Sequence, residues 1–214
     1  MGTEERKERE KLRRRNEILD AAETVFAEKG IREATMEDIA AKAELGKSTV
    51  YLYFRFKELI YLGLDWRGSK IEKKMFEKAS ASAANGLDKV IAIGRAYFEY
   101  AFTYPLYFQM KTIIESIPIS DIEKVKDEPV FIDFQKVIEG VQKVLLDAII
   151  LGMQDGTIAP DRDPLRTGLT VWSTSNGFLH LMASRGEILE KLYGVDTMAM
   201  TEEFFTDMRK SLRP

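Results

Sequence analysis

Cysteine is absent from the 214 residues, and histidine occurs only once, as His180. Disulfides and thiolate metal sites are therefore excluded. One imidazole cannot form a His/Cys metal cluster, and it makes a histidine-based catalytic triad difficult to assemble. No run of 18 or more apolar residues occurs, and the chain begins with charged residues. We therefore expect no membrane span, no signal peptide, no metal, no cofactor and no enzymatic activity, in a protein suited to the reducing cytoplasm.

Helical periodicity runs through the chain, and no alternation typical of strands is evident. With 45% hydrophobic and 31% charged residues, the composition is that of a soluble globular protein with one large or two small domains. The net charge of −3 argues against a surface coated in positive charge, so any contact with nucleic acid must be local. We predict an all-α fold.

The most specific pattern lies in residues 35–59. Thr35 is a favourable N-cap, and Asp38 three residues later completes a capping-box-like pair at the start of a short helix. Gly46 supplies the permissive backbone of a tight turn, and residues 47–54 read as a second short helix. Two short helices joined by such a turn predict a helix-turn-helix, whose second helix docks in the DNA major groove.

The second helix has side chains suited to DNA contact. Val50 and Phe54 are spaced to be buried, and no acidic residue occurs from Lys47 to Lys57. An ordinary helical hairpin with a solvated polar face is the alternative, but it does not explain two tyrosines and three cations on one exposed strip. We predict DNA contacts from Thr35, Lys47, Ser48, Thr49, Tyr51, Tyr53 and Lys57, the last at a phosphate.

This segment resembles the DNA-binding domain of TetR/AcrR-type repressors. The resemblance covers about the first quarter of the chain and is carried by Ile39, Ala40, Ala43, Lys47, Thr49, Val50, Tyr51, Tyr53, Phe54, Lys57, Glu58 and Leu59. The sequence departs from the family pattern at Glu44 and Ser48, where glycine is usual, and at Gly46, where serine is common. A non-glycine residue at the turn costs on the order of 1 kcal/mol if its backbone must be left-handed.

Residues 6–15 contain seven cations and only two glutamates. This run fits a solvated helix start or a disordered tail, and it equally fits a basic arm that touches DNA phosphates. From Asn16 an apolar helical stripe continues until Lys29-Gly30 and completes a three-helix core.

The chain divides into two predicted domains, a helix-turn-helix DNA-binding domain at 1–57 and a larger helical effector-binding and dimerisation domain at 58–214. A helix from Lys57 toward residue 80 links them, and the small polar residues 80–86 follow it. Further helices are predicted over about 87–104, 106–117, 131–153, 164–186 and 197–212, with a turn of helix around 121–125.

The predicted helix from Pro164 to Arg185 is apolar almost all round. Leu165, Leu169, Trp172, Asn176 and Leu179 share one predicted face, and Val171, Thr174, Phe178 and Leu181 share another. Burial on both sides favours core on one face and a partner subunit on the other, although burial wholly inside the monomer gives the same pattern. In the family that the chain resembles, two long late helices form the dimer interface.

Aromatic residues gather in the second predicted domain. They fit a packed core, and they equally fit a pocket for an apolar or aromatic molecule. The resemblance to ligand-responsive repressors favours effector contacts from some of them, and we predict a site formed by Tyr97, Phe98, Phe108, Met110, Trp172 and Asn176.

Together these patterns predict a homodimeric transcriptional regulator that binds double-stranded operator DNA and is released from a palindrome by a small hydrophobic effector. Two alternatives stay open at this point. One is a TetR-like regulator without effector response, and the other is a helical small-molecule carrier. The operator and the identity of the effector are not encoded in any motif of the sequence.

Overall fold

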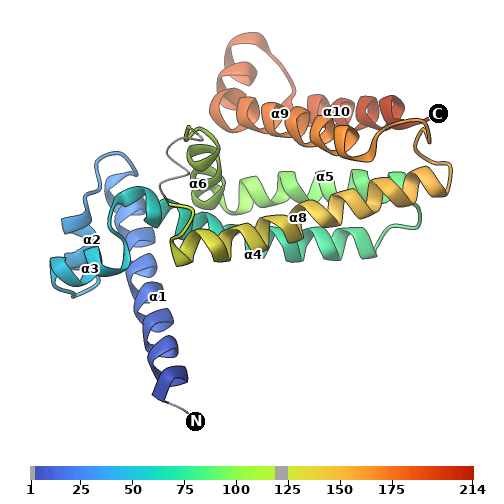
Figure 1. Ribbon diagram of the computed structural model, residues 1–214. Helices are drawn as coiled ribbons and strands as arrows, with labels where there is room; N and C mark the ends of the chain where they lie inside the picture. Colours follow the sequence, from blue (N-terminus) through green and yellow to red (C-terminus); the bar gives the residue numbers. More distant parts are fainter. Residues whose placement is uncertain (1–2, 119–124) are drawn as a thin grey trace. The chain divides into compact units, whose positions relative to one another are not determined.

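The computed structural model describes residues 3–118 and 125–214, and these residues form helices and turns without any strand (Figure 1). The all-α prediction is therefore confirmed. The helices are α1 (Thr3–Lys29), α2 (Met36–Lys42), α3 (Lys47–Tyr53), α4 (Lys57–Ala81), α5 (Gly86–Thr103), α6 (Pro105–Glu115), α8 (Pro129–Gln154), α9 (Pro164–Tyr193) and α10 (Thr197–Leu212).

These helices fall into two compact units. Unit 1 comprises the described parts of 1–67 and 106–134, and unit 2 comprises 68–105 and 135–214. The residues of α4 are divided between the two units at Arg67. The functional boundary that we predict at residue 57 stays a prediction.

Unit 1 is built on the second half of α1, against which α2 packs, and α3 packs against α2 (Figure 1). Burial along α1 begins at Ile18 and Leu19, which are 0% and 1% exposed, whereas residues 5–12 are all exposed. The apolar faces of α2 and α3 close this core through Ile39 and Val50, both fully buried. The expected three-helix arrangement of the helix-turn-helix is present.

Arg67 fastens the first part of α4 to α1 within unit 1. Its guanidinium lies 2.6 Å from a carboxylate oxygen of Asp20 and 2.9 Å from one of Glu23, and it also donates to the carbonyl of Asn16 at 2.9 Å. The Arg67 side chain is largely shielded from water, so this planar fork holds the two helices in a defined register.

Unit 2 packs α5, α9 and α10 around an aromatic cluster. Phe98 of α5 contacts Phe178 of α9 and Phe205 of α10, with ring centroids 5.7 and 4.8 Å apart. The start of α5 also approaches the end of α8 closely, because a Cβ on Gly86 would lie only 1.9 Å from the backbone nitrogen of Gly152. Glycine is therefore required at residue 86 for this packing.

Two predicted helix ends differ from the structure. The first helix begins at Thr3, before the apolar stripe that starts near Asn16, and α9 continues past its predicted end at Gly186 to Tyr193, where Gly194 caps it with φ +65°. One interior glycine costs only about 1 kcal/mol, and the Glu187–Lys191 ion pair supports the extra turns. The turn of helix predicted around 121–125 lies mostly outside the described residues.

The two predicted faces of α9 also need correction. Leu165, Leu169 and Trp172 are 61%, 55% and 42% exposed, but Leu179, placed with them by sequence, is fully buried. The inward side is formed by Thr167, Val171, Ser175, Leu179 and Met182. Residues spaced three or four apart shift gradually around the axis of a long helix. Leu179 therefore faces the core, although Leu169 points outward.

Candidate nucleic-acid interface

The start of α2 is fixed by a complete capping box. The Thr35 hydroxyl oxygen accepts from the backbone N–H of Asp38 at 3.1 Å, and the Asp38 carboxylate accepts from the Thr35 N–H at 3.0 Å. Lys29, at the end of α1, donates to the same carboxylate at 2.5 Å. Thr35 was predicted to contact DNA. It is exposed, and its hydroxyl is engaged in this cap.

The same contacts make the stability of unit 1 depend on pH. Hydrogen bonds from Lys29 and then from Thr35 lower the pKa of Asp38 to about 2. Since the folded pKa lies below the unfolded value of about 3.9, the carboxylate stabilises the fold above pH 4, and this contribution is lost as the pH falls toward 2. Denaturant titrations are expected to show Asp38→Asn less stable than the wild type at pH 5 and equal to it near pH 2. A deficit that is the same at both pH values would contradict the assignment, and Asp161→Asn, at an exposed turn, is the control.

The turn between α2 and α3 places its left-handed residue at Glu44, which has φ +55°. Gly46, which we expected to supply the permissive backbone, has φ −62° and serves as the N-cap of α3 without a side-chain hydrogen bond. The left-handed residue therefore lies at position 44, where the family that the chain resembles usually has glycine. Because Glu44 carries a side chain, its left-handed backbone is strained.

Relieving that strain is expected to stabilise the domain. Glu44→Gly should raise the free energy of unfolding by about 1 kcal/mol, measured by denaturant titration. Glu33→Gly is the matched control, because Glu33 is also an exposed glutamate in a turn but has no positive φ. It should lower stability by about 0.5 kcal/mol. Equal effects of the two changes would show that the conformation of Glu44 carries no strain.

One face of α3 points away from the core. Val50 is fully buried, and Thr49 and Tyr53 are half-buried on the flanks. The exposed side chains, one turn apart in two pairs, are Lys47, Ser48, Tyr51 and Leu52. The structure therefore brings three of the predicted residues together on the outward face and places two at its edges, and it adds Leu52, which our sequence reasoning missed.

Lys47 is paired with an acidic neighbour on this face. Its ammonium forms an ion pair with Glu37 of α2 and lies 5.9 Å from the ring centroid of Tyr51. The hydrogen bond to Glu37 raises the pKa of Lys47. Because both partners are exposed, this pair contributes little stability and can be exchanged for a phosphate at small cost.

Lys57 lies differently from the rest of the predicted set. Its ammonium donates to the carbonyl oxygens of Ile31 and Arg32, at 2.6 and 3.2 Å, and lies 5.6 Å from the ring centroid of Tyr61. Burial lowers the pKa of this lysine. These contacts hold the loop after α1 against the start of α4, so the phosphate contact of Lys57 stays a prediction beside an evident structural role.

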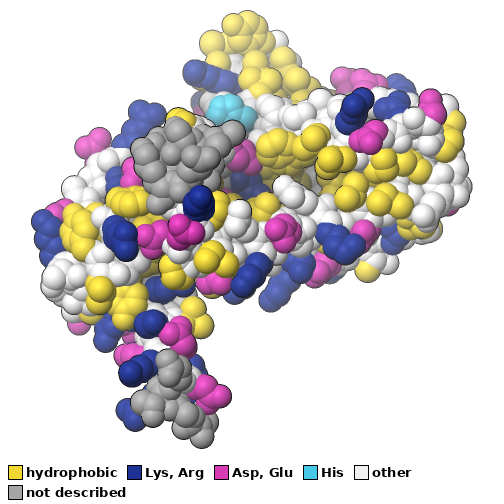
Figure 2. Space-filling view, viewed as in Figure 1, with side chains coloured by type: hydrophobic (Ala, Val, Ile, Leu, Met, Phe, Trp, Pro, Cys, Tyr) yellow, Lys and Arg dark blue, Asp and Glu magenta, His cyan; other side chains and the backbone are white. Residues whose placement is uncertain are grey.

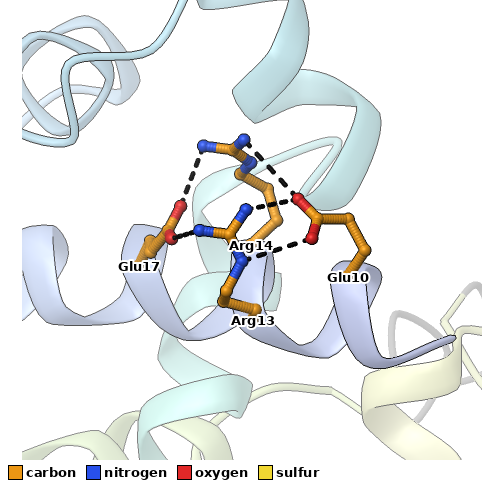
Figure 3. Close-up of polar contacts among 4 residues, drawn as sticks. All are labelled: Glu10, Arg13, Arg14 and Glu17. Carbon is orange, nitrogen blue, oxygen red and sulfur yellow. Dashed lines mark hydrogen bonds and ion pairs between the residues drawn. The ribbon is translucent and has the colours of Figure 1, made fainter. Parts of the chain in front are cut away.

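The basic run of residues 6–15 is helical, and part of its positive charge is paired with glutamates of the same helix. Arg13 forms ion pairs with Glu10 and Glu17, and Arg14 lies 2.8 Å from Glu17 (Figure 3). Figure 2 shows cationic and anionic side chains interspersed along this protruding part of α1. The helix-start interpretation is confirmed, and a role as a DNA-binding arm stays a prediction.

The predicted effector residues are divided between the two units. In unit 2, the Tyr97 hydroxyl donates to Asn176 at 2.9 Å, Phe98 is buried in the aromatic cluster, and Trp172 is exposed. Phe108 and Met110 are buried within unit 1. In this structure Tyr97 and Phe98 therefore pack as core side chains.

A groove of about 670 Å³ lies instead between α9 and α10 in unit 2. Its lining includes the apolar side chains of Val171, Phe178 and Phe204 and the charged side chains of Arg166 on α9 and Glu203 on α10. None of the six predicted effector residues lines this groove. The apolar stripe of the last helix, which includes Phe204, was the available sequence signal for it.

Across residues 3–118 and 125–214, no group of three or more acidic or histidine side chains is placed to hold a metal ion. Of the helices described, none has the length and apolar composition needed to cross a membrane.

Comparison with known proteins gives one family and several relatives. Residues 18–64 match the family described as "Bacterial regulatory proteins, tetR family". The HTH-type transcriptional repressor KstR2 of Mycolicibacterium smegmatis is 26% identical over 159 residues, which cover 70% of each chain. The HTH-type transcriptional regulator YfiR of Bacillus subtilis is 36% identical over 86 residues, which span 37% of this chain and only 42% of YfiR.

Solved structures show the same fold over nearly the whole chain. The transcriptional regulator FadR from Bacillus subtilis, in complex with stearoyl-CoA, superposes with a TM-score of 0.68 and covers 92% of this chain and 98% of its own. The sequence identity is 17%, so this likeness concerns the fold alone. The match at residues 18–64 contains α2, the Glu44 turn and α3, where the exposed polar face lies.

Proposed function

We propose, from the premise that this chain belongs to the TetR family of transcriptional regulators, that it is a homodimeric repressor released from a palindromic operator by a hydrophobic effector. The observation that carries the DNA-binding part is the outward face of α3. Residues 47–57 contribute no acidic side chain to this face, which is exposed over Lys47, Ser48 and Tyr51 and is held in place by the capped helix α2. Hydroxyl and ammonium donors of this kind bind phosphates and base edges in the major groove.

Selection of duplexes from a randomised pool by the full chain tests this proposal. The expected result is enrichment of a palindrome. Its half-sites should be separated by one DNA turn, about 34–36 Å, or by a distance close to it. Binding should weaken steeply with salt, because phosphate contacts release counterions. Recovery of unenriched sequence would leave non-specific binding only and would contradict the proposal.

Dimerisation is proposed through the outward face of α9. Leu165, Leu169 and Trp172 expose apolar surface along successive turns, and His180 and Ser184 continue the same outward region toward the carboxyl end. Single exposed apolar residues are common, but a row on one helix marks an interaction surface. A second copy is the partner that a palindromic operator requires.

Effector control is proposed to act through α4. This helix begins beside the helix-turn-helix, is fastened to α1 by Arg67, and continues into unit 2. A ligand that separates Tyr97 from Asn176 in unit 2 would displace the helices around it and tilt α4 as a lever. FadR holds stearoyl-CoA on this same fold, so a long-chain acyl-CoA is the first effector to test.

The lever gives a quantitative expectation for the acyl-CoA probe. Stearoyl-CoA should weaken operator binding about 5- to 150-fold, and operator should weaken stearoyl-CoA binding by the same factor, because coupling between two sites is reciprocal. Both constants can be measured by anisotropy and by quenching of Trp172 in a Trp66→Phe background. Tyr97→Phe removes the hydrogen bond to Asn176 that the ligand must break, so it should raise probe affinity and leave operator affinity without probe unchanged. Quenching with no change in operator affinity would contradict the lever.

A further inference from the structure

Leu52 is the most exposed large hydrophobic side chain recorded in the described part of the chain, at 79%. It lies on α3, one turn after Ser48 and next to Tyr51, on the outward face that the proposed function assigns to DNA. A solitary exposed leucine needs no explanation elsewhere on a protein surface. The other exposed side chains of α3, those of Lys47, Ser48 and Tyr51, are hydrogen-bond donors, so an isobutyl group among them has a distinct consequence.

The chemistry of the major groove limits what such a side chain can contact favourably. Guanine, adenine and cytosine present acceptors or amino donors there, which lose water without compensation when covered by an apolar group. Thymine alone presents an apolar group, the C5 methyl. A leucine entering the groove therefore gains from thymine and loses from the other three bases.

We propose that Leu52 is a specificity-determining residue that reads the C5 methyl group of one thymine in each operator half-site. This inference rests on the proposed DNA-binding function and deepens it. Lys47, Ser48 and Tyr51 supply polar contacts that hold the helix in the groove, and Leu52 supplies discrimination by contact with a single methyl group.

Replacement of thymine by deoxyuridine tests the contact at the level of one methyl group. With the palindrome selected by the wild-type chain, each symmetric pair of thymines is changed to deoxyuridine in turn. Burial of one methyl group is worth about 0.8 kcal/mol, which is about fourfold in affinity. One symmetric pair, contacted by both subunits, should therefore lower wild-type affinity roughly 15-fold, and the others should have smaller effects.

Leu52→Ala closes the double-mutant cycle. The variant should bind the unmodified palindrome more weakly than the wild type does and should lose no further affinity when the sensitive thymines become deoxyuridine. Leu12→Ala is the matched control, because Leu12 is also an exposed helical leucine in unit 1 but lies on α1. It should keep the full sensitivity to deoxyuridine. Since Leu52 is exposed, its variant should melt at the wild-type temperature.

Two outcomes would overturn the inference while leaving the proposed function intact. One is a selected palindrome in which no thymine methyl affects wild-type affinity. The other is a Leu52→Ala variant that remains as sensitive to deoxyuridine as the wild type, which would assign the methyl contact to another residue. Failure of the selection to enrich any sequence would instead overturn the proposed function together with this inference.

Discussion

Leu169→Glu is expected to convert the protein to a monomer and to weaken operator binding by about 100-fold or more. Leu169 is 55% exposed in the middle of the outward face of α9. A carboxylate there would be buried at a two-fold interface opposite its own copy, where it is neither solvated nor paired. Loss of the dimer removes the second half-site contact, and linked binding of two modules commonly contributes factors of 10² to 10⁴.

Light scattering gives the mass, and anisotropy gives the affinity for the selected palindrome. Leu192→Glu is the matched control on the same helix, since Leu192 is 73% exposed and lies about 140° around the axis from Leu169. It should remain a dimer with wild-type affinity. A monomeric wild type at micromolar concentration would contradict the interface, as would a dimeric Leu169→Glu.

Tyr51→Ala is expected to lower affinity for the operator about tenfold or more while changing affinity for random DNA much less. Tyr51 is 37% exposed on the outward face of α3, where its hydroxyl can reach a base edge or a phosphate in each half-site. One lost base contact costs about 1–3 kcal/mol of discrimination. Lys47→Ala should likewise lower affinity for the operator more than affinity for random DNA, if the Lys47 ammonium leaves Glu37 to bind a base.

Tyr193→Ala provides the control for this experiment. Tyr193 is 72% exposed at the end of α9, so its truncation removes an equivalent exposed ring from a region without a proposed DNA contact. Equal losses on operator and random DNA for Tyr51→Ala would move Tyr51 from base recognition to phosphate binding. Wild-type affinity for both would remove it from the interface.

The helix-turn-helix could be predicted from sequence because its signals are local. Thr35 and Asp38 form the expected cap, and the last helix has the predicted bounds. Such signals depend on backbone groups within a few residues, so tertiary packing has little power to override them. The family pattern also indicated the turn residue at Glu44, although the permissive glycine two residues later led us to assign the turn to Gly46.

Long-range features could not be obtained in the same way. The position of Leu179 in the core depends on how α9 drifts over many turns, and the ammonium of Lys57 is held by carbonyl groups 25 and 26 residues earlier. Leu52 was missed for another reason, because only polar side chains were considered for the DNA-facing side. Its position two residues after the buried Val50, about 200° around the helix, was a sufficient signal.

The predicted effector residues show where periodicity stops being informative. Aromatic side chains at helical spacing line a cavity or fill it, and the sequence pattern is the same in both cases. In the structure Tyr97 and Phe98 are packed, and a groove lies between α9 and α10 instead. Only a binding measurement with a defined probe separates a core that opens for a ligand from one that does not.

The central claim, sequence-specific DNA recognition by a dimer through α3, is tested most directly by one anisotropy comparison. The wild-type chain is titrated against its selected palindrome and against a scrambled duplex of the same length and composition, at one physiological salt concentration. The proposed function predicts that the palindrome binds at least about 10³-fold more tightly, with two chains per duplex. Equal affinity for the two duplexes would contradict it.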